Sequence, residues 1–254
     1  MKLDDKVAVI TGAASGMGRE MAKLFAIEGA KIVAADWHEE ALSAVVAEVA
    51  AAGGQITGIR GNVSVRADCE AIIARAVEAY GSVDVLCNNA GVMDLNQGAA
   101  EVEDDMWERV MGINLYGPLC LTRAAIPVMI KHGGGSIVNT GSVAGLGGAA
   151  AGVAYTVSKH GLIGLTRSTS YMYGPEGIRC NLIAVGAVET NIMQSIDVSK
   201  MDPKGSQRLQ KWYAMIPLAL KPIDIARVAL FLASDEAKGV DGAVLRTDAG
   251  WTVA

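Results

Sequence analysis

The chain has 254 residues, of which 51% are hydrophobic and 19% are charged. A chain of this length and apolar content can bury a large core in one domain. The formal net charge is −5 at pH 7 and no basic block stands out, so we expect neither nucleic acid nor an anionic membrane surface as a partner.

Short apolar runs alternate with amphipathic stretches along the chain. The runs are continuous, which is typical of parallel strands buried on both faces. The amphipathic stretches 19–29, 39–53 and 67–81 each end in glycine, a common helix stop. The pattern predicts one α/β domain over 1–254, a doubly wound (Rossmann-type) seven-stranded parallel sheet with helices on both faces. The expected strands are 7–10, 31–35, 55–59, 83–86, 136–139, 179–185 and 243–246.

The segment 187–222 is longer than an ordinary connection and carries Met193, Trp212 and Tyr213. Long insertions in compact domains are often lids or binding loops. The segment also follows the carboxyl end of an expected strand, where open α/β sheets bind ligands. We therefore expect a substrate lid; the alternative is a surface helical hairpin that only packs.

The four cysteines form no C-x-x-C pair and no histidine clusters with them. We expect no metal site and no disulfide framework. The N-terminal stretch "MKLDDKVAVI" has acidic residues where a signal peptide needs an apolar core. No uninterrupted apolar stretch reaches the ~18 residues of a membrane span, so we expect a cytoplasmic protein.

The stretch "TGAASGMG" (11–18) places Gly12, Gly16 and Gly18 between the first strand and the first helix. Glycines let the backbone approach a pyrophosphate closely, and the helix N-terminus offers free N–H groups and a partial positive charge. The spacing is G-x-x-x-G-x-G rather than the common G-x-G-x-x-G. The alternative is an ordinary strand-to-helix turn.

Asp36 ends the second expected strand. A carboxylate at this place can accept hydrogen bonds from the ribose hydroxyls of an adenosine and repels a 2′-phosphate. No Arg or Lys stands at 37 or within 13–15 to bind such a phosphate. The pattern favours NAD(H) over NADP(H); the alternative is a solvated carboxylate at a strand end.

Five motifs in order resemble the short-chain dehydrogenase/reductase family, of the classical type. They are "TGAASGMG" (11–18), "NNAG" (88–91), "IN" (113–114), "NTGSVAG" (139–145) and "YTVSK" (155–159), and the resemblance covers nearly the whole chain. It implies reversible hydride transfer between a small-molecule alcohol or carbonyl and a nicotinamide ring. The implied catalytic residues are Asn114, Ser142, Tyr155 and Lys159.

Tyr155 and Lys159 are four apart and would share a helix face. A Lys⁺ about 5 Å from a phenol, at an effective dielectric near ~20, favours phenolate by roughly 3 kcal/mol, so we expect a lowered Tyr155 pKa and a general acid/base role. The resemblance adds a bond from Lys159 to the nicotinamide ribose, a hydrogen bond from Ser142 to the substrate oxygen, and a water held by Asn114. His160 would point about 100° away around the helix.

Each of these residues has a purely structural alternative. Ser142 could cap a turn, Asn114 could satisfy backbone groups at a helix irregularity, and Tyr155 with Lys159 could be an exposed contact.

The resemblance also implies the cofactor contacts, position by position. Asn62 stands where the family usually has Asp, Val185 where it has Pro, and Ala249 where it has Gly; we expect Ala249 to have little consequence for the chemistry. The implied cofactor-binding residues are Gly12, Ser15, Gly16, Met17, Gly18, Asp36, Trp37, Asn62, Val63, Asn89, Ala90, Gly91, Tyr155, Lys159, Gly186, Val188 and Thr190.

The expected substrate pocket is mostly apolar, which suits a hydrophobic secondary alcohol or ketone. Its residues are Ser142, Met93, Leu146 and Met193, with Trp212 or Tyr213 from the lid. Asp94, Asn96 and Glu189 are polar exceptions.

Other functions stay open. The polar exceptions would favour a sugar, polyol or diol dehydrogenase with the same catalytic residues. A non-catalytic NAD-sensing protein is a further hypothesis. A reductase of carrier-bound acyl groups is less favoured, because it would need a basic docking surface. The resemblance implies a homotetramer, packed through long helices at about 103–131 and 152–173.

Overall fold

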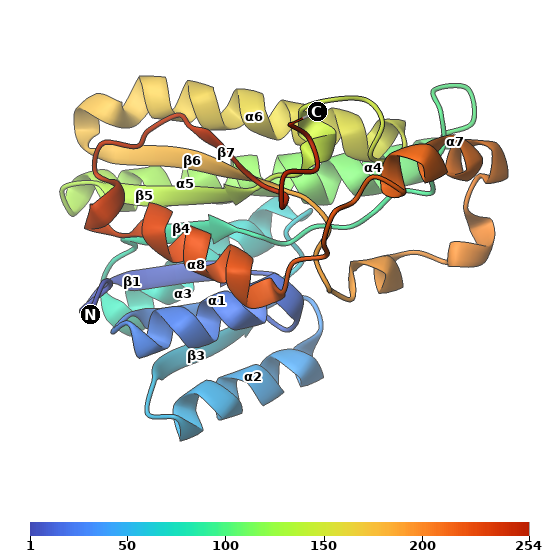
Figure 1. Ribbon diagram of the computed structural model, residues 1–254. Coiled ribbons are helices and arrows are strands. Elements are labelled where there is room, and N and C mark those ends of the chain that lie inside the picture. The colour runs from blue at the N-terminus through green and yellow to red at the C-terminus, as the bar shows by residue number, and fades with distance from the viewer. Residues whose placement is uncertain (254) are drawn as a thin grey trace.

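The computed structural model describes residues 1–253 and contains one seven-stranded sheet in the order β3-β2-β1-β4-β5-β6-β7 (Figure 1). All neighbouring strands are parallel, which confirms the predicted fold class. The fourth strand begins later than expected, because its ladder with β1 starts at Val85 opposite Ala8. The strands are β1 Val7–Thr11, β2 Lys31–Asp36, β3 Gln55–Arg60, β4 Val85–Asn88, β5 Gly135–Thr140, β6 Ile178–Val185 and β7 Val244–Thr247.

Helices cover both faces of the sheet (Figure 1). One hydrophobic cluster joins α1, α2 and α8 to the sheet, while others join α3, α5 and α6 to the opposite face. The helices are α1 Gly16–Ile27, α2 Glu39–Ala51, α3 Arg66–Tyr80, α4 Asp104–Met111, α5 Gly117–Lys131, α6 Val153–Tyr173, α7 Pro203–Tyr213 and α8 Pro222–Ala233.

A π-helical turn, Gly112–Tyr116, joins α4 and α5 into one long helical segment. The segment Asp104–Lys131 is long and apolar enough to cross a membrane by length and composition, but half of its most apolar window is buried inside the protein. Leu121, Ala125 and Met129 of α5 belong to the core. The apolar character of this segment is therefore that of a core helix.

The chain order of the sheet reverses between β1 and β4, which are neighbours in space. In open α/β sheets the ligand binds outside the carboxyl ends of the strands at this point. The glycine loop follows β1 and the "NNAG" motif follows β4, and the two meet: a Cβ on Gly12 would lie 2.9 Å from the Cα of Ala90. The fold thus places two of the predicted motifs together.

The segment 187–222 projects beyond the sheet (Figure 1) and contains two short 3-10 turns and α7. It is tied to the rest of the chain by backbone and side-chain hydrogen bonds. The amide of Asp202 donates to the carbonyl of Leu95 at 2.8 Å, and the Tyr213 hydroxyl donates to the carbonyl of Ala150 at 3.2 Å. Its role as a lid stays a prediction.

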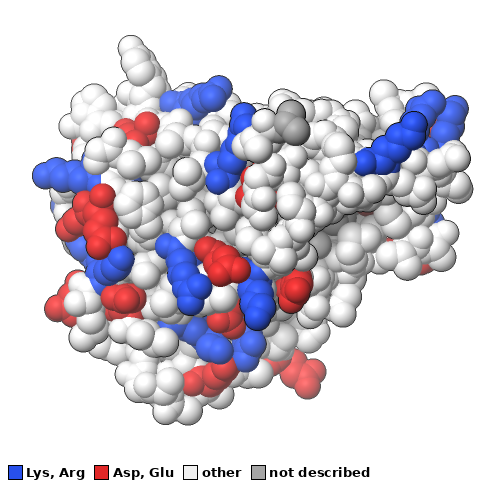
Figure 2. Space-filling view, viewed as in Figure 1, with Lys and Arg blue, Asp and Glu red and all other residues white. Residues whose placement is uncertain are grey.

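Charges are distributed unevenly over the face seen in Figure 2. Over α1 and α2 acidic and basic side chains are intermixed, and Glu48 pairs with both Arg19 (2.7 Å) and Lys23 (3.0 Å). On α7 the exposed side chains of Lys204, Arg208 and Lys211 are spaced four and three residues apart, so they share one side of that helix.

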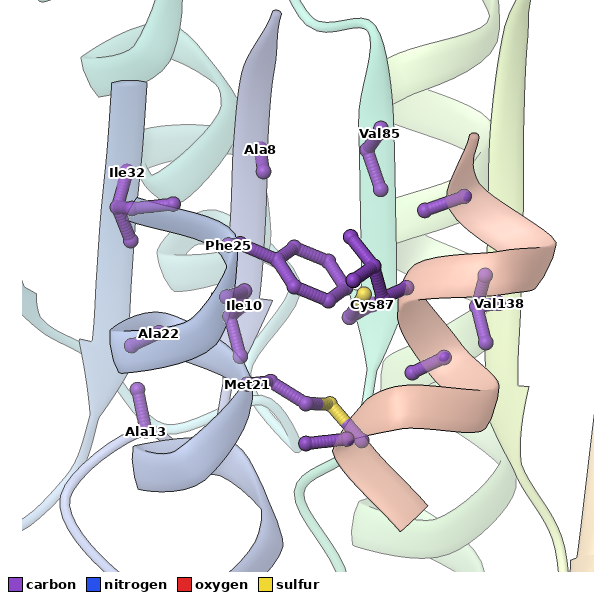
Figure 3. Close-up of a cluster of buried hydrophobic side chains, with 14 of the residues drawn as sticks. Ala8, Ile10, Ala13, Met21, Ala22, Phe25, Ile32, Val85, Cys87 and Val138 are labelled. Carbon is purple, nitrogen blue, oxygen red and sulfur yellow. The ribbon is translucent and has the colours of Figure 1, made fainter. Parts of the chain in front are cut away.

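Alternate residues of β1 face opposite layers, so that Ala8 and Ile10 pack with α1 while Val7 and Val9 pack with α3 and α5. Phe25 of α1 is completely buried between this strand, β4 and α8 (Figure 3). Figure 3 shows its ring pointing toward Cys87.

Replacing Phe25 with Ala removes a large ring from a close-packed core. We expect Phe25→Ala to lower the free energy of unfolding by about 3–5 kcal/mol, measured by urea denaturation. Ile27→Ala is the matched control on the same helix, because Ile27 is 70% exposed, and we expect it to change stability by less than about 0.5 kcal/mol. Equal losses in the two variants would contradict the assigned core.

Candidate active site

The glycine loop has the shape of a phosphate cradle. Gly12 and Gly16 have φ angles of +65° and +51°, a region that other residues rarely adopt. A Cβ on Gly18 would collide with the carbonyl oxygen of Gly12. Only glycine therefore lets strand, turn and helix approach so closely.

The N-terminus of α1 is open toward an anion. Ser15 occupies the N-cap position without a side-chain capping bond, and no acidic residue lies in the first turn. Thr190 from the loop after β6 lies over Gly16, since its Cγ2 would be 3.4 Å from a Cβ there. Met17 packs against the core behind the turn. Free amides and the helix dipole favour a pyrophosphate at this place, so the residues present fit a dinucleotide.

Asp36 lies at the end of β2, beside the glycine loop. Its Oδ2 accepts a hydrogen bond from the Ala14 amide and its Oδ1 one from the His38 amide, both at 3.0 Å. Trp37 is 71% exposed. Arg60, which sequence reasoning missed, pairs with Asp36 in the strand register and donates to the Trp37 carbonyl at 3.4 Å. A cation therefore does lie near the expected ribose site, supplied by a neighbouring strand.

Asn62 uses its side-chain oxygen locally. Its Oδ1 accepts from the amide of Ser64 at 3.1 Å and from the Ser64 hydroxyl at 2.8 Å, which forms a turn before α3. Its own amide donates to Asp68 at 2.8 Å. Val63 is buried. The side-chain oxygen of Asn62, one of the implied cofactor-binding residues, is thus engaged in a turn.

The "NNAG" motif joins β4 to the glycine loop. Thr11 accepts hydrogen bonds at its hydroxyl from the amides of Asn89 (3.1 Å) and Ala90 (3.2 Å). The Asn89 side chain donates to the Thr11 carbonyl at 2.9 Å. Asn88 points into the protein instead and donates to Asn139 at 2.8 Å. Sequence reasoning did not predict these roles of Thr11 and Asn139, because their hydrogen-bond partners are distant in the chain.

Tyr155 and Lys159 lie together on the buried face of α6. Their exposed fractions are 8% and 4%, and the Lys159 Nζ is 5.3 Å from the centre of the Tyr155 ring. The Lys159 ammonium donates to the carbonyl of Thr140 at 2.9 Å. The alternative that Tyr155 and Lys159 form only an exposed surface contact is therefore wrong. His160 is exposed on another side of the helix and bonds Thr156.

The predicted lowering of the Tyr155 pKa is wrong for the protein alone. Burial raises the pKa of Tyr155 to about 12; the hydrogen bond with Ser142 opposes this, and the charges of Asp94 and Tyr213 add to it. Burial likewise lowers the pKa of Lys159 to about 8. Desolvation disfavours the charged form of both groups and is the largest cause of both shifts.

Ser142 and Asn114 have structural partners as well as a place near Tyr155 and Lys159. The Ser142 hydroxyl accepts from the Ala144 amide at 3.1 Å, capping a short turn. Asn114 lies in the π-helical turn and exchanges hydrogen bonds with the backbone of Val92 at 2.9 and 3.0 Å. A Cβ on Gly91 would lie 3.4 Å from the Asn114 oxygen and 3.7 Å from the Lys159 nitrogen. The two groups therefore flank Gly91.

The loop after β6 follows a defined path despite Val185. That residue continues β6 by pairing with Thr247. Val188 then pairs with Leu220, which closes the base of the projecting segment. A Cβ on Gly186 would lie 2.7 Å from Asp248, so Gly186 is packed against the C-terminal turn.

In that turn Ala249 has a φ of +55°, a left-handed backbone conformation that costs alanine more than the glycine usual in the family.

The apolar residues predicted for the pocket differ in exposure. Met93 is half-buried next to the cluster that contains Tyr155, whereas Leu146 and Met193 are 37% and 41% exposed. Two of the polar exceptions, Asp94 and Asn96, are buried and bonded within the protein. Glu189 is exposed.

Trp212 packs on Trp251, with ring centres 5.5 Å apart.

Comparison with known proteins identifies relatives of this chain. A sequence model of a protein family described as "Enoyl-(Acyl carrier protein) reductase" matches residues 12–252. The chain is 40% identical to 3beta-hydroxysteroid dehydrogenase 2 of Eggerthella lenta over 251 residues, 98% of this chain and 96% of the relative. It is 38% identical to short chain dehydrogenase ausX of Penicillium brasilianum, over 98% of this chain and 97% of the relative.

Two solved structures are also similar to this chain. Levodione reductase has a TM-score of 0.90 and 32% identity, covering 99% of both chains. A short-chain dehydrogenase/reductase of Burkholderia xenovorans has a TM-score of 0.89 and 32% identity, over 100% of this chain and 98% of that one.

The family model matches nearly the whole chain, and the relatives at 40% and 38% identity cover 98% of it. The chain therefore belongs to the classical short-chain dehydrogenase/reductases, a family of oxidoreductases that act on small molecules with a nicotinamide cofactor.

Proposed function

We propose that this protein is an NAD(H)-dependent oxidoreductase that interconverts a secondary alcohol and a ketone, with Tyr155 as general acid/base. The observation that carries the proposal is the burial of Tyr155 beside Lys159 and Ser142, at the edge of the sheet where the glycine loop lies. A phenol, an ammonium and a hydroxyl at one place are the groups that carbonyl reduction requires.

The cofactor supplies the hydride acceptor or donor, and the chain's own residues manage the proton. In alcohol oxidation the Tyr155 oxygen takes the hydroxyl proton as hydride leaves the carbon; in ketone reduction it returns that proton to the oxygen. The Ser142 hydroxyl donates a hydrogen bond to the same substrate oxygen and stabilises the charge that develops there. Lys159 stays mostly cationic at neutral pH, because its pKa of about 8 lies above 7, and it favours phenolate when Tyr155 has given up its proton.

We propose a largely apolar substrate of considerable size. Asp94 and Asn96, whose polarity favoured a sugar or polyol, are buried in the protein, which leaves only the exposed Glu189 in support of that alternative. Leu146, which follows β5, and Met193, which belongs to the projecting segment, remain exposed; we propose that this segment is the substrate lid. A relative at 40% identity is named for a hydroxysteroid, a rigid apolar secondary alcohol.

A carrier-bound acyl group is the second candidate. The description of the matching family model names an acyl carrier protein, and Lys204, Arg208 and Lys211 give α7 an exposed basic side. A panel of steroids, aryl and aliphatic ketones, sugars and acyl thioesters, followed at the absorbance of NADH, distinguishes the candidates. Turnover confined to acyl thioesters would overturn the preference for free alcohols.

The expected homotetramer stays a prediction. Tyr171 and Met172 of α6 are 85% and 60% exposed and offer apolar surface to another subunit.

The first test removes the phenolic oxygen. We expect Tyr155→Phe to lower kcat by on the order of 10²–10⁴-fold, because no group then gives or takes the proton. NADH affinity, measured by fluorescence titration, should stay within a few-fold of wild type, since the ring is kept. Tyr171→Phe on the same helix is the control and should retain full activity. Near wild-type turnover by Tyr155→Phe would reject the mechanism, and a protein that binds NADH without turnover would favour the sensing hypothesis.

The second test is the pH dependence of kcat/KM, which reports groups of the free enzyme. Ketone reduction needs protonated Tyr155 and cationic Lys159, so its rate should be level near neutrality and fall as the pH rises through about 8. Alcohol oxidation needs the phenolate, whose fraction below a pKa of about 12 grows with pH, so oxidation should rise from about pH 6 to 8 and rise less steeply once Lys159 loses its charge. An oxidation rate that is level from about pH 6 to 9 would contradict the raised Tyr155 pKa.

The third test concerns the choice of cofactor. Asp36→Ala removes the acceptor for the ribose hydroxyls and the charge that repels a 2′-phosphate, so we expect NAD to bind about tenfold more weakly or worse. The kcat/KM ratio of NAD to NADP should fall as well, because Arg60 lies nearby to contact the phosphate.

The double variant Asp36→Ala/Arg60→Ala is the control, in which the gain for NADP should disappear. A wild-type preference for NADPH would show that Arg60, rather than Asp36, determines the choice.

A further inference from the structure

The carboxylate of Asp94 caps α6 from outside that helix. Asp94 is 1% exposed. Its Oδ1 accepts a hydrogen bond from the Gly152 amide at 3.1 Å, and its Oδ2 accepts one from the Tyr155 amide at 2.9 Å. Gly152 holds the N-cap position of α6 and has no side chain to bond these amides. A residue about sixty positions earlier in the chain therefore performs the capping.

The loop that carries Asp94 serves more of the helix start. The Val153 amide donates to the Gln97 carbonyl at 2.9 Å. The first amides of a helix have no partner within it, and here the loop supplies partners for Gly152, Val153 and Tyr155. The Asp94 carboxylate is itself held by the Asn96 amide at 3.1 Å. A Cβ on Gly152 would lie 2.6 and 2.7 Å from the two carboxylate oxygens, so the approach requires glycine at this position.

This contact connects Tyr155 to the loop after β4, which also carries Met93 of the expected substrate pocket. Tyr155 is one of the residues whose backbone Asp94 holds, while its partner Ser142 comes from a separate turn after β5. The same loop also holds the projecting segment: the Met93 amide donates to the Ser195 hydroxyl at 3.1 Å. A shift of the loop would move the phenol relative to the substrate oxygen.

We propose that Asp94 is a positioning residue for Tyr155: its carboxylate fixes the first turn of α6 and so holds the phenol in place for proton transfer. The proposal rests on the proposed oxidoreductase function.

The groups that face the phenol come from four elements. Lys159 lies on α6 itself, Ser142 follows β5, Tyr213 belongs to α7 and Asp94 lies in the loop after β4. After burial, the largest cause of the raised Tyr155 pKa, Asp94 and Tyr213 raise it further and Ser142 lowers it. Removing the Asp94 charge should therefore move the pKa of Tyr155 down.

The experiment compares Asp94→Asn with wild type. Asn keeps one acceptor but presents an NH₂ group to the other amide, so one capping bond is lost together with the charge. We expect kcat to fall by on the order of 10–100-fold, because small misplacements of a reacting group have effects of this size. NADH affinity should change less than about twofold, and the alcohol-oxidation profile should shift to lower pH.

Asp224→Asn is the matched control, since Asp224 bonds the Lys221 amide at the start of α8. It should lower the unfolding temperature without moving kcat or the pH profile. Gly152→Ala is the second variant, because its methyl group displaces the carboxylate and leaves the charge in place. It should lower kcat with a smaller shift of the alcohol-oxidation pH profile. It also tests the proposal if Asp94→Asn does not fold.

Hydrogen exchange of the peptide 150–158 gives a readout that needs no turnover. Faster exchange in Asp94→Asn, with no change in Asp224→Asn, supports the capping role. Folded Asp94→Asn with wild-type kcat and pH profile would overturn the proposal. A wild-type protein that transfers no hydride to any substrate in the panel counts against the proposed function instead, and hydrogen exchange then still decides whether Asp94 holds the helix.

Discussion

The reversal of strand order between β1 and β4 is the constraint on which the site depends. All seven strands are parallel, so their carboxyl ends meet at one edge, and the reversal brings the loops after β1 and β4 together there. Gly12 touches Ala90 across this junction, and Thr190 from the loop after β6 reaches over Gly16. Residues from widely separated parts of the chain thus line one surface without any long excursion of the backbone.

Burial then shifts the pKa values of Tyr155 and Lys159, which lie at this edge of the sheet. Tyr155 and Lys159 would titrate near their ordinary pKa values on an exposed helix, but here water is excluded from both. Desolvation favours the neutral phenol and the neutral amine together, so the pKa of Tyr155 rises to about 12 while that of Lys159 falls to about 8. The free protein therefore holds a protonated phenol beside a lysine that is still mostly charged at neutral pH, the state in which a carbonyl can be protonated.

The sequence was sufficient for features that depend on local pattern. The glycine turn, the strand periodicity and the i,i+4 spacing of Tyr155 and Lys159 each depend on residues close together in the chain, and each is present in the fold. Arg60 could not be found in this way, because only the register of β2 and β3 places it opposite Asp36. The direction in which the Tyr155 pKa shifts was also not predicted. It depends on burial by several elements, which the spacing of residues does not reveal.

Asp94 illustrates why polar residues near a site are hard to interpret from sequence. Its position two residues after Val92 suggests a pocket residue that could bind a polyol, yet its carboxylate is occupied by three backbone amides. A carboxylate held in this way no longer offers its oxygens to a substrate, and its remaining influence is geometric and electrostatic. A negative charge nevertheless stays close to the phenol. Under the proposed function, the same residue holds the acid in place without contributing polar contacts to the substrate.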